Sequence, residues 1–301
     1  MIDFEGRVAV VTGAGGGLGR AYSLLLAERG AAVVVNDLGG SVHGEGASSS
    51  AADDVVAQIR AAGGTAVAEY SSVATPEGGA AIVQRAVDEF DRIDILINNA
   101  GILRDRTLVN MELQDLTSVL DVHLLGAFFV TKPALLQMRE QQYGRIVVTS
   151  SGSGLFGNFG QSNYGAAKMG LVGFMNVLKL EGAKYGVTVN AIAPIARTRM
   201  TEELLGDRAE KFSPESVAPA VAYLVSEGCE LTGDIWSVGG GSVSRVFVGL
   251  ADGYFKHPDH AGALTVEDVA EHVGDVRAED GYIVPFSGRD EFAKLGPRLF
   301  S

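Results

Sequence analysis

The sequence predicts a three-layer α/β fold built on a doubly wound sheet of seven parallel strands, followed by a C-terminal extension. Short apolar runs alternate with amphipathic helical runs along residues 7–240, a pattern typical of strand–helix–strand units. A glycine-rich turn, TGAGGGLG at residues 12–19, joins the first apolar run to the first helix. Consecutive parallel strands need helical crossovers of this kind, so we expect one parallel sheet.

Seven apolar runs have the length and the flanking residues of buried strands. Among the helices between them, one is expected from Pro76, because Thr75 is a capping residue and proline suits the first helical position. Residues 113–142 form a longer helical region, and a later helix is expected to continue through Leu180. The expected strands are residues 7–12, 32–35, 65–68, 94–97, 145–149, 187–191 and 235–238.

The chain length of 301 residues suits one large domain with an extension. We predict a main domain over residues 1–241 and an extension over residues 242–301. Within the extension we expect a strand at residues 245–248 and a helix from Thr265, with Asp268 in the capping-box position. Its polar composition, interrupted by glycine and proline, predicts a lid or an arm that reaches a neighbouring subunit, not an independent domain.

The composition limits the partners and the compartment of the protein. A net charge of −13 argues against nucleic acid and against an anionic membrane as partners. The single cysteine, Cys229, excludes an intramolecular disulfide and a cysteine-built metal site, and no metal is expected. No apolar run reaches membrane-spanning length, the N-terminal residues lack a signal-peptide core, and the final residues RLFS are not a peroxisomal address. We therefore expect a cytoplasmic protein.

The glycine-rich turn is expected to bind the pyrophosphate of a dinucleotide. It follows a strand and opens a helix, as in Rossmann-type folds, and Asp37 lies about 20 residues further on. Because glycines carry no side chain, a pyrophosphate can approach the helix N-terminus, where backbone N–H groups favour an anion. The expected contacts are Gly13, Gly17, Leu18 and Gly19.

Asp37 predicts NAD as the cofactor, not NADP. A carboxylate at the end of the second strand accepts hydrogen bonds from the ribose hydroxyls and repels a 2′-phosphate. No arginine or lysine occurs within residues 13–19 or directly after Asp37. Past the fourth strand, the NNAG segment places two side-chain amides at the same edge of the sheet. Asn99, Ala100 and Gly101 are therefore expected to line the cofactor crevice.

Ser151, Tyr164 and Lys168 form the candidate catalytic group. Tyr164 and Lys168 are four residues apart and therefore share one face of a helix, and a loop can return the Ser151 hydroxyl to the same pocket. A phenol has an unperturbed pKa of about 10, and a nearby ammonium favours the phenolate. We expect Lys168 and a cationic cofactor ring to bring the pKa of Tyr164 near neutrality, which needs about 4 kcal/mol.

The helix over residues 164–180 carries apolar side chains around most of its circumference. Such a pattern indicates burial on most sides. In an outer layer over a sheet, a second subunit is the simplest cover. We therefore expect a homodimer or a homotetramer.

Taken together, these motifs resemble the short-chain dehydrogenase/reductase family. The resemblance covers about residues 7–240 and implies a dinucleotide-binding catalytic domain there. It implies that Tyr164 is the general acid or base and that Ser151 orients the substrate oxygen. It also implies that Lys168 both tunes Tyr164 and binds the nicotinamide ribose, while a hydride passes between the substrate carbon and the nicotinamide.

Within that family, four segments are similar to the (3R)-hydroxyacyl-CoA dehydrogenase units of type 2 multifunctional enzymes, a group also called 17β-hydroxysteroid dehydrogenases of type 4. The long C-terminal part also suits that group, and we expect the unit to stand alone here, without hydratase or carrier domains. The four segments are NDLGG at 36–40, NNAGILRDR at 98–106, YGRIVVTSS at 143–151 and GNFGQSNY at 157–164.

Three positions depart from the family pattern. His123 stands where the family has an asparagine that is thought to hold a water of the proton relay, and a histidine can take that role. Pro194 is followed by isoleucine in place of the usual glycine, while Thr198 matches the position that contacts the nicotinamide amide. The usual Asp-Val pair near the adenine is Ser72-Val73, whose hydroxyl can still accept from the adenine amine.

The resemblance implies an NAD-dependent dehydrogenase that oxidises a 3-hydroxyacyl-CoA, with a steroid side-chain CoA ester as one form of this substrate. One alternative is a 17β-hydroxysteroid dehydrogenase that acts on free steroid alcohols. A different class is a non-catalytic, NAD-sensing binding protein, but such proteins tend to lose the serine, tyrosine and lysine that this chain keeps. The candidate contacts for the CoA phosphates and the acyl chain are Arg104, Arg106, Arg197, Arg199, Leu155, Phe156 and Phe159.

Overall fold

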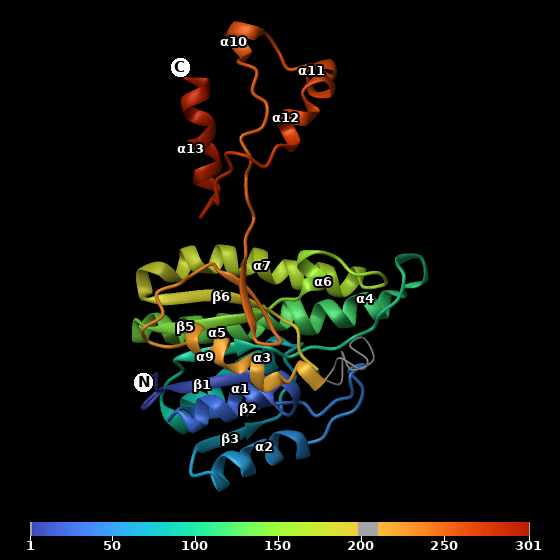
Figure 1. Ribbon diagram of the computed structural model, residues 1–301. Helices are drawn as coiled ribbons and strands as arrows, with labels where there is room; N and C mark the ends of the chain where they lie inside the picture. Colours follow the sequence, from blue (N-terminus) through green and yellow to red (C-terminus); the bar gives the residue numbers. More distant parts are fainter. Residues whose placement is uncertain (1, 198–209, 301) are drawn as a thin grey trace. The chain divides into compact units, whose positions relative to one another are not determined.

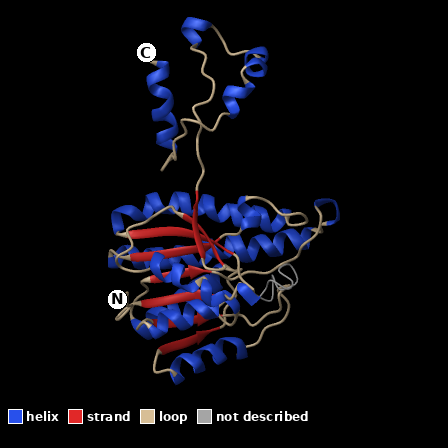
Figure 2. Ribbon diagram, in the orientation of Figure 1, coloured by secondary structure: helices blue, strands red, loops and turns tan. Residues whose placement is uncertain are grey.

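The computed structural model describes residues 2–197 and 210–300. Its strands form one sheet in the order β3-β2-β1-β4-β5-β6-β7-β8 (Figures 1 and 2). All seven predicted strands are confirmed, with small changes at their ends. The strands are β1 Val8–Thr12, β2 Ala32–Asn36, β3 Thr65–Glu69, β4 Ile95–Asn98, β5 Gly144–Thr149, β6 Val187–Pro194, β7 Ile235–Gly239 and β8 Ser242–Val246.

The strands β1 to β7 pair in parallel, as the sequence predicts. β1 lies between β2 and β4, with Val11 opposite Val35 on one side and Ile97 on the other. The order of the strands therefore reverses at β1. In an open parallel sheet, ligands bind at the carboxyl edge of such a reversal.

The eighth strand was not part of the predicted sheet. β8 follows β7 after only two residues, Gly240 and Gly241, whose φ angles are +57° and +81°. Two consecutive positive φ angles make the tight turn of a hairpin, and a two-residue connection can join only antiparallel neighbours. The strand expected at residues 245–248 therefore begins earlier, at Ser242, and closes one edge of the sheet.

Helices cover both faces of the sheet and form the outer two layers. Alternate residues of the strands, such as Val11, Val33 and Val35, share one apolar core with residues of α1, α2 and α9. Successive strand residues point to opposite faces, and α3, α5 and α7 cover the other face, with α5 in contact with both α3 and α7. The main helices are α1 Gly17–Glu28, α2 Ser50–Ala61, α3 Pro76–Phe90, α4 Leu113–Leu120, α5 Gly126–Gln141, α6 Gly152–Leu155, α7 Ser162–Gly182 and α9 Ala218–Leu224.

The predicted helix start at Thr75 is confirmed, because the Thr75 hydroxyl accepts a hydrogen bond from the Gly78 N–H at 3.1 Å. The long helical region is also confirmed as a run over Leu113–Gln141, in which a π-helical turn, η2 Asp121–Leu125, joins α4 to α5. This run is long and apolar enough to cross a membrane, so the expectation that no run reaches that length was wrong. Length and composition are weak evidence here, since a core helix meets the same test and this run packs against α3 and α7.

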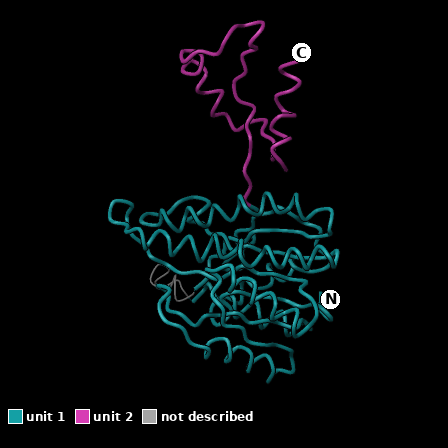
Figure 3. The backbone as a smooth tube through the Cα atoms, turned by 180° about the vertical axis from the view of Figure 1, so that it is seen from behind, with its two compact units in different colours: residues 1–245 teal, residues 246–301 magenta. Residues whose placement is uncertain are grey.

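The chain divides into two compact units, residues 1–245 and residues 246–301 (Figure 3). In the second unit, Thr265 and Asp268 form the predicted capping box at the start of α11. No residue between Val246 and Phe300 is buried, although many of them are large and apolar. The helices of this unit are α10 Pro258–Ala261, α11 Val266–Glu271, α12 Val273–Arg277 and α13 Gly288–Leu299.

Candidate active site

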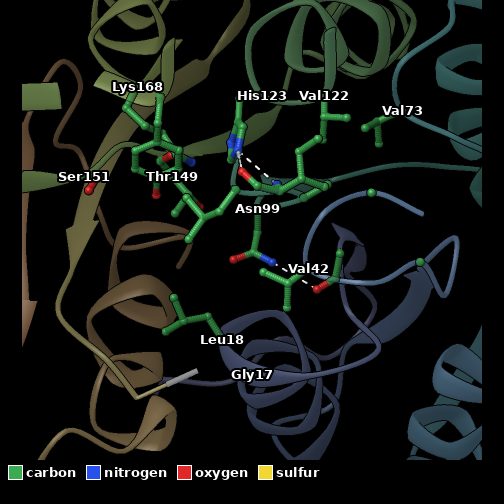
Figure 4. Close-up of a pocket in the computed structure, with 18 of the residues that line it drawn as sticks. Gly17, Leu18, Val42, Val73, Asn99, Val122, His123, Thr149, Ser151 and Lys168 are labelled. Atoms are coloured by element: carbon green, nitrogen blue, oxygen red, sulfur yellow. Dashed lines mark hydrogen bonds between the residues drawn. The ribbon is translucent and has the colours of Figure 1, made fainter. Parts of the chain in front are cut away.

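A cavity of about 580 Å³ lies at the carboxyl ends of the parallel strands. In Figure 4, Ser151, His123 and Lys168 lie at one end of it and Leu18 at the other, with Asn99 between them. Most of the sequence-predicted site residues are therefore brought together. Those that line the cavity are Gly13, Gly17, Leu18, Asp37, Ser72, Val73, Asn99, Ala100, Gly101, Arg104, His123, Ser151, Tyr164, Lys168 and Pro194.

The glycine-rich turn has the geometry of an anion cradle. Gly13 and Gly17 have φ angles of +63° and +51°, a region that favours glycine. A Cβ on Gly19 would lie 2.3 Å from the Gly13 carbonyl oxygen, so a side chain there would break the turn; Gly19 supports the cradle without lining the cavity. α1 begins with no side-chain cap and no acidic residue in its first turn, which leaves its first N–H groups for a phosphate.

The Asp37 carboxylate is held in place by the backbone at the end of β2. Its Oδ2 accepts from the Gly15 N–H at 2.8 Å, and its Oδ1 accepts from the Gly39 N–H at 2.7 Å. Each oxygen keeps a second lone pair for another donor. Asp37 also lines the cavity. Because its Oδ2 is bonded to Gly15, this oriented carboxylate lies beside the glycine-rich turn.

Asn99 lines the cavity, as the sequence predicts, and its amide also holds the glycine-rich turn. Its Nδ2 donates to the carbonyl oxygens of Thr12 and Gly13, at 3.0 and 3.1 Å, so the side chain holds the glycine-rich turn in shape. The other amide of the pair, Asn98, donates to the Thr131 hydroxyl at 2.9 Å. Asn99 therefore lines the crevice and stabilises its glycine-rich turn, while Asn98 supports the crevice from behind.

Ser151 and Tyr164 meet at the end of β5 and the start of α7. Ser151 caps α6, and its hydroxyl accepts from the Ser153 N–H at 3.2 Å. The pKa of Tyr164 is raised to about 12, mainly by burial. A hydrogen bond with the Ser151 hydroxyl opposes this rise, and the Asp105 carboxylate adds to it. Lys168 was expected to lower the pKa of Tyr164, but the groups of the chain alone leave this pKa above its usual value.

Lys168 is buried against the end of β5. Its ammonium donates to the Thr149 carbonyl oxygen and lies 5.5 Å from the centre of the Tyr164 ring. Burial lowers the pKa of Lys168 to about 7. Because Ser150 Oγ also donates to the Lys168 carbonyl oxygen at 2.8 Å, this turn of α7 is tied directly to β5.

His123 lies inside the π-helical turn, a local irregularity that is frequent at functional sites. Its Nε2 lies 2.8 Å from the Ile102 carbonyl oxygen and 3.0 Å from the Ile102 nitrogen, and its ring meets the Tyr164 ring edge-on at 5.1 Å. Burial lowers the pKa of His123 well below its usual value, and the Lys168 ammonium lowers it further. Its buried Nδ1 has no hydrogen-bond partner in the described part of the chain, beside a small cavity that Lys168 also lines.

The arginines proposed to hold CoA phosphates are engaged with the protein itself. Arg106 Nε lies 2.9 Å from the Asp115 carboxylate, and Arg104 Nη1 lies 3.8 Å from it. Arg104 Nε also donates to the His43 carbonyl oxygen at 3.1 Å. This partial neutralisation weakens both residues as phosphate ligands, and only Arg104 lines the cavity.

The other substrate candidates among the described residues do not line the cavity. Leu155 is half-buried, Phe156 and Phe159 are exposed, and Arg197 is exposed beyond β6. Thr198 and Arg199 lie outside the described residues.

The long polar loop after β2 lines part of the cavity, a role that the sequence reasoning did not assign to it. Residues 38–48 close on themselves, since the Ser48 N–H donates to the Leu38 carbonyl oxygen at 2.9 Å. The loop then docks on the segment after β4, because the Leu103 N–H donates to the Val42 carbonyl oxygen at 2.9 Å and His43 Nδ1 lies 3.0 Å from the Leu103 carbonyl oxygen. Compact loops of this kind are frequently functional. The sequence carried a signal for this loop, because the stretch is polar and is longer than such connections usually are.

The residues present fit a nicotinamide dinucleotide. The glycine cradle accepts a pyrophosphate, the Asp37 carboxylate accepts ribose hydroxyls, and the cavity wall includes Thr149, whose hydroxyl oxygen is buried without a partner in the described structure. Among residues 2–197 and 210–300, no group of three or more His, Cys, Asp or Glu side chains is placed to hold a metal ion.

Comparisons with known proteins agree with this geometry. Residues 7–209 match the family described as short chain dehydrogenase. The chain is 54% identical over 278 residues to a short-chain type dehydrogenase/reductase of Mycobacterium tuberculosis, covering 92% of this chain and 96% of that protein. It is also 37% identical over 260 residues to a hydroxyacyl-CoA dehydrogenase of the same organism, covering 81% of this chain and 80% of that one.

A longer relative is the peroxisomal multifunctional enzyme type 2 of Drosophila melanogaster. The sequence is 50% identical to it over 279 residues, which cover 91% of this chain and 46% of that protein. The solved full-length structure of that enzyme superimposes with a TM-score of 0.83 at 40% identity and covers 99% of this chain and 50% of that one. The chain thus spans about half the length of this multifunctional relative.

Proposed function

The chain belongs to the short-chain dehydrogenase family, and on that premise we propose that this oxidoreductase oxidises a 3-hydroxyacyl-CoA to the 3-oxoacyl-CoA with NAD⁺ as the hydride acceptor. The observation that carries the proposal is the meeting of Ser151, Tyr164 and Lys168 at one end of a cavity whose other end is a phosphate cradle. The hydroxyacyl-CoA substrate is supported by the 37% identical mycobacterial relative, which is described as a hydroxyacyl-CoA dehydrogenase.

In the proposed reaction, the substrate hydroxyl binds between Ser151 and Tyr164. The Ser151 hydroxyl orients the substrate oxygen, and the Tyr164 phenolate takes the hydroxyl proton as the carbon gives up its hydride. Bound NAD⁺ supplies the hydride acceptor and a positive charge near the phenol. The Lys168 side chain adds a second positive charge when its amine is protonated. The pKa of Lys168 is about 7, so this protonation occurs close to neutral pH.

His123 is proposed to keep the proton path open behind Tyr164. It contacts the Tyr164 ring, and its unpaired Nδ1 adjoins a small buried cavity that Lys168 and Thr12 also line. A neutral imidazole nitrogen can accept from a water or an ammonium there. The substitution of histidine for the family asparagine is therefore compatible with a relay.

Cofactor choice is proposed to follow from Asp37. A 2′-phosphate on NADP would meet a carboxylate that two backbone N–H groups already orient toward the cavity. Two negative charges placed side by side repel each other, and the described residues of the glycine-rich turn include no cation to offset the repulsion. We infer that NAD is preferred.

Cofactor preference can be measured directly. The wild-type enzyme should show a kcat/KM for NAD more than about tenfold higher than for NADP, the equivalent of about 1.4 kcal/mol. Asp37→Asn should narrow this ratio, because it removes the negative charge and keeps the side-chain size. Asp54→Asn, an exposed carboxylate on α2, serves as the control and should leave the ratio unchanged. Equal use of both cofactors by the wild type would contradict this interpretation of Asp37.

The substrate is tested by comparing matched alcohols. A 3-hydroxyacyl-CoA should give a kcat/KM for NADH formation at least about tenfold above that of the same 3-hydroxy acid without CoA, since the phosphates and the pantetheine add binding energy. The kcat/KM for a free steroid alcohol should be compared in the same way with that for a steroid side-chain CoA ester. Equal specificity constants for the CoA ester and the free alcohol would reject the acyl-CoA assignment and favour the free-steroid alternative.

We propose that the outer layer formed by α5 and α7 is covered by a second copy of the chain. Phe128 and Leu136 on α5, and Val177 and Leu180 on α7, are each 45–54% exposed. α5 and α7 contact each other, so these side chains belong to one layer of the fold. The second unit, residues 246–301, buries no described residue, so we propose that it is a lid or a dimer arm that needs a neighbour for its core.

Light scattering at micromolar concentration should report a dimer or a larger even assembly. A Leu136→Asp, Val177→Asp double variant should shift the protein toward the monomer, because a buried unpaired charge is costly. Val109→Asp, whose side chain is exposed and lies outside α5, α7 and the second unit, serves as the surface control. A monomeric wild type would contradict the proposed interface.

A further inference from the structure

We propose that Asn163 is a positioning residue for Tyr164, an inference that rests on the proposed function because it treats Tyr164 as the acid–base group. Asn163 directly precedes Tyr164 in α7 and is only 1% exposed. It does not line the cavity, so it does not act on the substrate. Its carboxamide is instead fully engaged by three parts of the backbone.

The first contact fixes the start of α7. Tyr164 is the third residue of this helix, and the first N–H groups of a helix have no partner within it. The Asn163 Oδ1 accepts the Tyr164 N–H at 2.8 Å. The backbone of the catalytic tyrosine is therefore held by the side chain of its neighbour.

The other two contacts join that turn to separate elements. The Asn163 Nδ2 donates to the Arg104 carbonyl oxygen at 2.9 Å and to the Asp115 carbonyl oxygen at 3.0 Å. Arg104 lies in the segment after β4, and Asp115 lies in the first turn of α4. One carboxamide therefore fixes α7 against two elements that approach from different directions.

The Arg104 segment is itself tied down. Asp115 binds both Arg104 and Arg106 through its carboxylate, and the His43 carbonyl oxygen accepts from Arg104 Nε. Arg104 and Arg106 are two of the residues that the sequence suggested for CoA phosphates. In the structure they make the frame to which Asn163 attaches Tyr164.

This arrangement predicts an effect on chemistry that is separate from cofactor binding. Ser151 follows β5, the glycine cradle is carried by β1 and α1, and the hydrogen bonds of the Asn163 carboxamide reach neither of them. A shift at the start of α7 would move the phenol relative to Ser151 and leave the cradle in place. A misplacement of about 1 Å can cost about 100-fold in rate.

The test variant is Asn163→Asp, which keeps the size of the side chain. Its new oxygen would face the carbonyl oxygens of Arg104 and Asp115, so two attractive contacts would become repulsive. We expect kcat to fall about 100-fold, with a displaced pH profile of kcat, while the Kd for NADH changes less than about threefold.

A matched control is available in β6. Asn190 is fully buried, its Nδ2 donates to the Leu231 carbonyl oxygen at 2.8 Å, and its Oδ1 accepts from the Asp234 N–H at 3.1 Å. It does not line the cavity. Asn190→Asp should therefore lower the melting temperature in the same way as Asn163→Asp but leave kcat within about threefold of the wild type.

Asn163→Ser is a milder second variant, measured if Asn163→Asp does not fold. Its hydroxyl can donate to only one of the two carbonyl oxygens, so kcat should fall by less than in Asn163→Asp. Equal kcat losses in the Asn163 and Asn190 variants, or an unchanged kcat in both Asn163 variants, would overturn the positioning role. An absence of NADH formation by the wild type would instead overturn the proposed function and, with it, the premise of this role.

Discussion

Seven parallel strands end at one edge of the sheet, and every group of the proposed reaction is carried by a loop or a helix that begins there. Parallel pairing imposes this arrangement, because each helical crossover returns the chain to the opposite edge before the next strand starts. The reversal of strand order at β1 then opens the crevice between the loops after β1 and β4. The phosphate cradle and the catalytic group are thus neighbours in space although some 130 residues separate Gly19 from Ser151.

Burial sets the electrostatics of this crevice and works against the proposed chemistry. It raises the pKa of Tyr164 to about 12 and lowers the pKa of Lys168 to about 7, so it favours the neutral form of each group. Bringing Tyr164 from there to neutrality needs about 7 kcal/mol, more than the unperturbed phenol would need. A protonated Lys168 and a cationic nicotinamide are the charges proposed to supply it, and the same low dielectric strengthens their effect. A precise placement of the phenol, such as Asn163 provides, becomes correspondingly important.

Much of the fold could be predicted from the sequence, because local patterns determine it. The seven strands, the capped start at Thr75 and the glycine-rich turn all follow from residues that are close together in the chain. The strand expected at residues 245–248 was not assigned to the sheet, because its antiparallel pairing depends on a hairpin turn of two glycines. The helical region at residues 113–142 was predicted, whereas its length and apolar composition, which would suit a membrane span, were not recognised.

The site was predicted less completely, because its side chains pair across distant segments. Arg104 and Arg106 looked free in the sequence, while the structure pairs both with Asp115. The bonds of Asn163 also reach residues 48 and 59 positions away, which no local pattern reveals. The cytoplasmic location and the bounds of the main domain and of the C-terminal extension stay predictions.

The central claim is that Tyr164 transfers the proton of the substrate hydroxyl. A single-turnover measurement of NADH formation from a 3-hydroxyacyl-CoA by Tyr164→Phe tests it most directly, with the exposed Tyr70→Phe variant as the control. The account predicts that the rate falls about 100- to 10,000-fold in Tyr164→Phe while NADH binding, followed by fluorescence, stays near that of the wild type. A Tyr164→Phe enzyme that forms NADH at a rate close to that of Tyr70→Phe would contradict it.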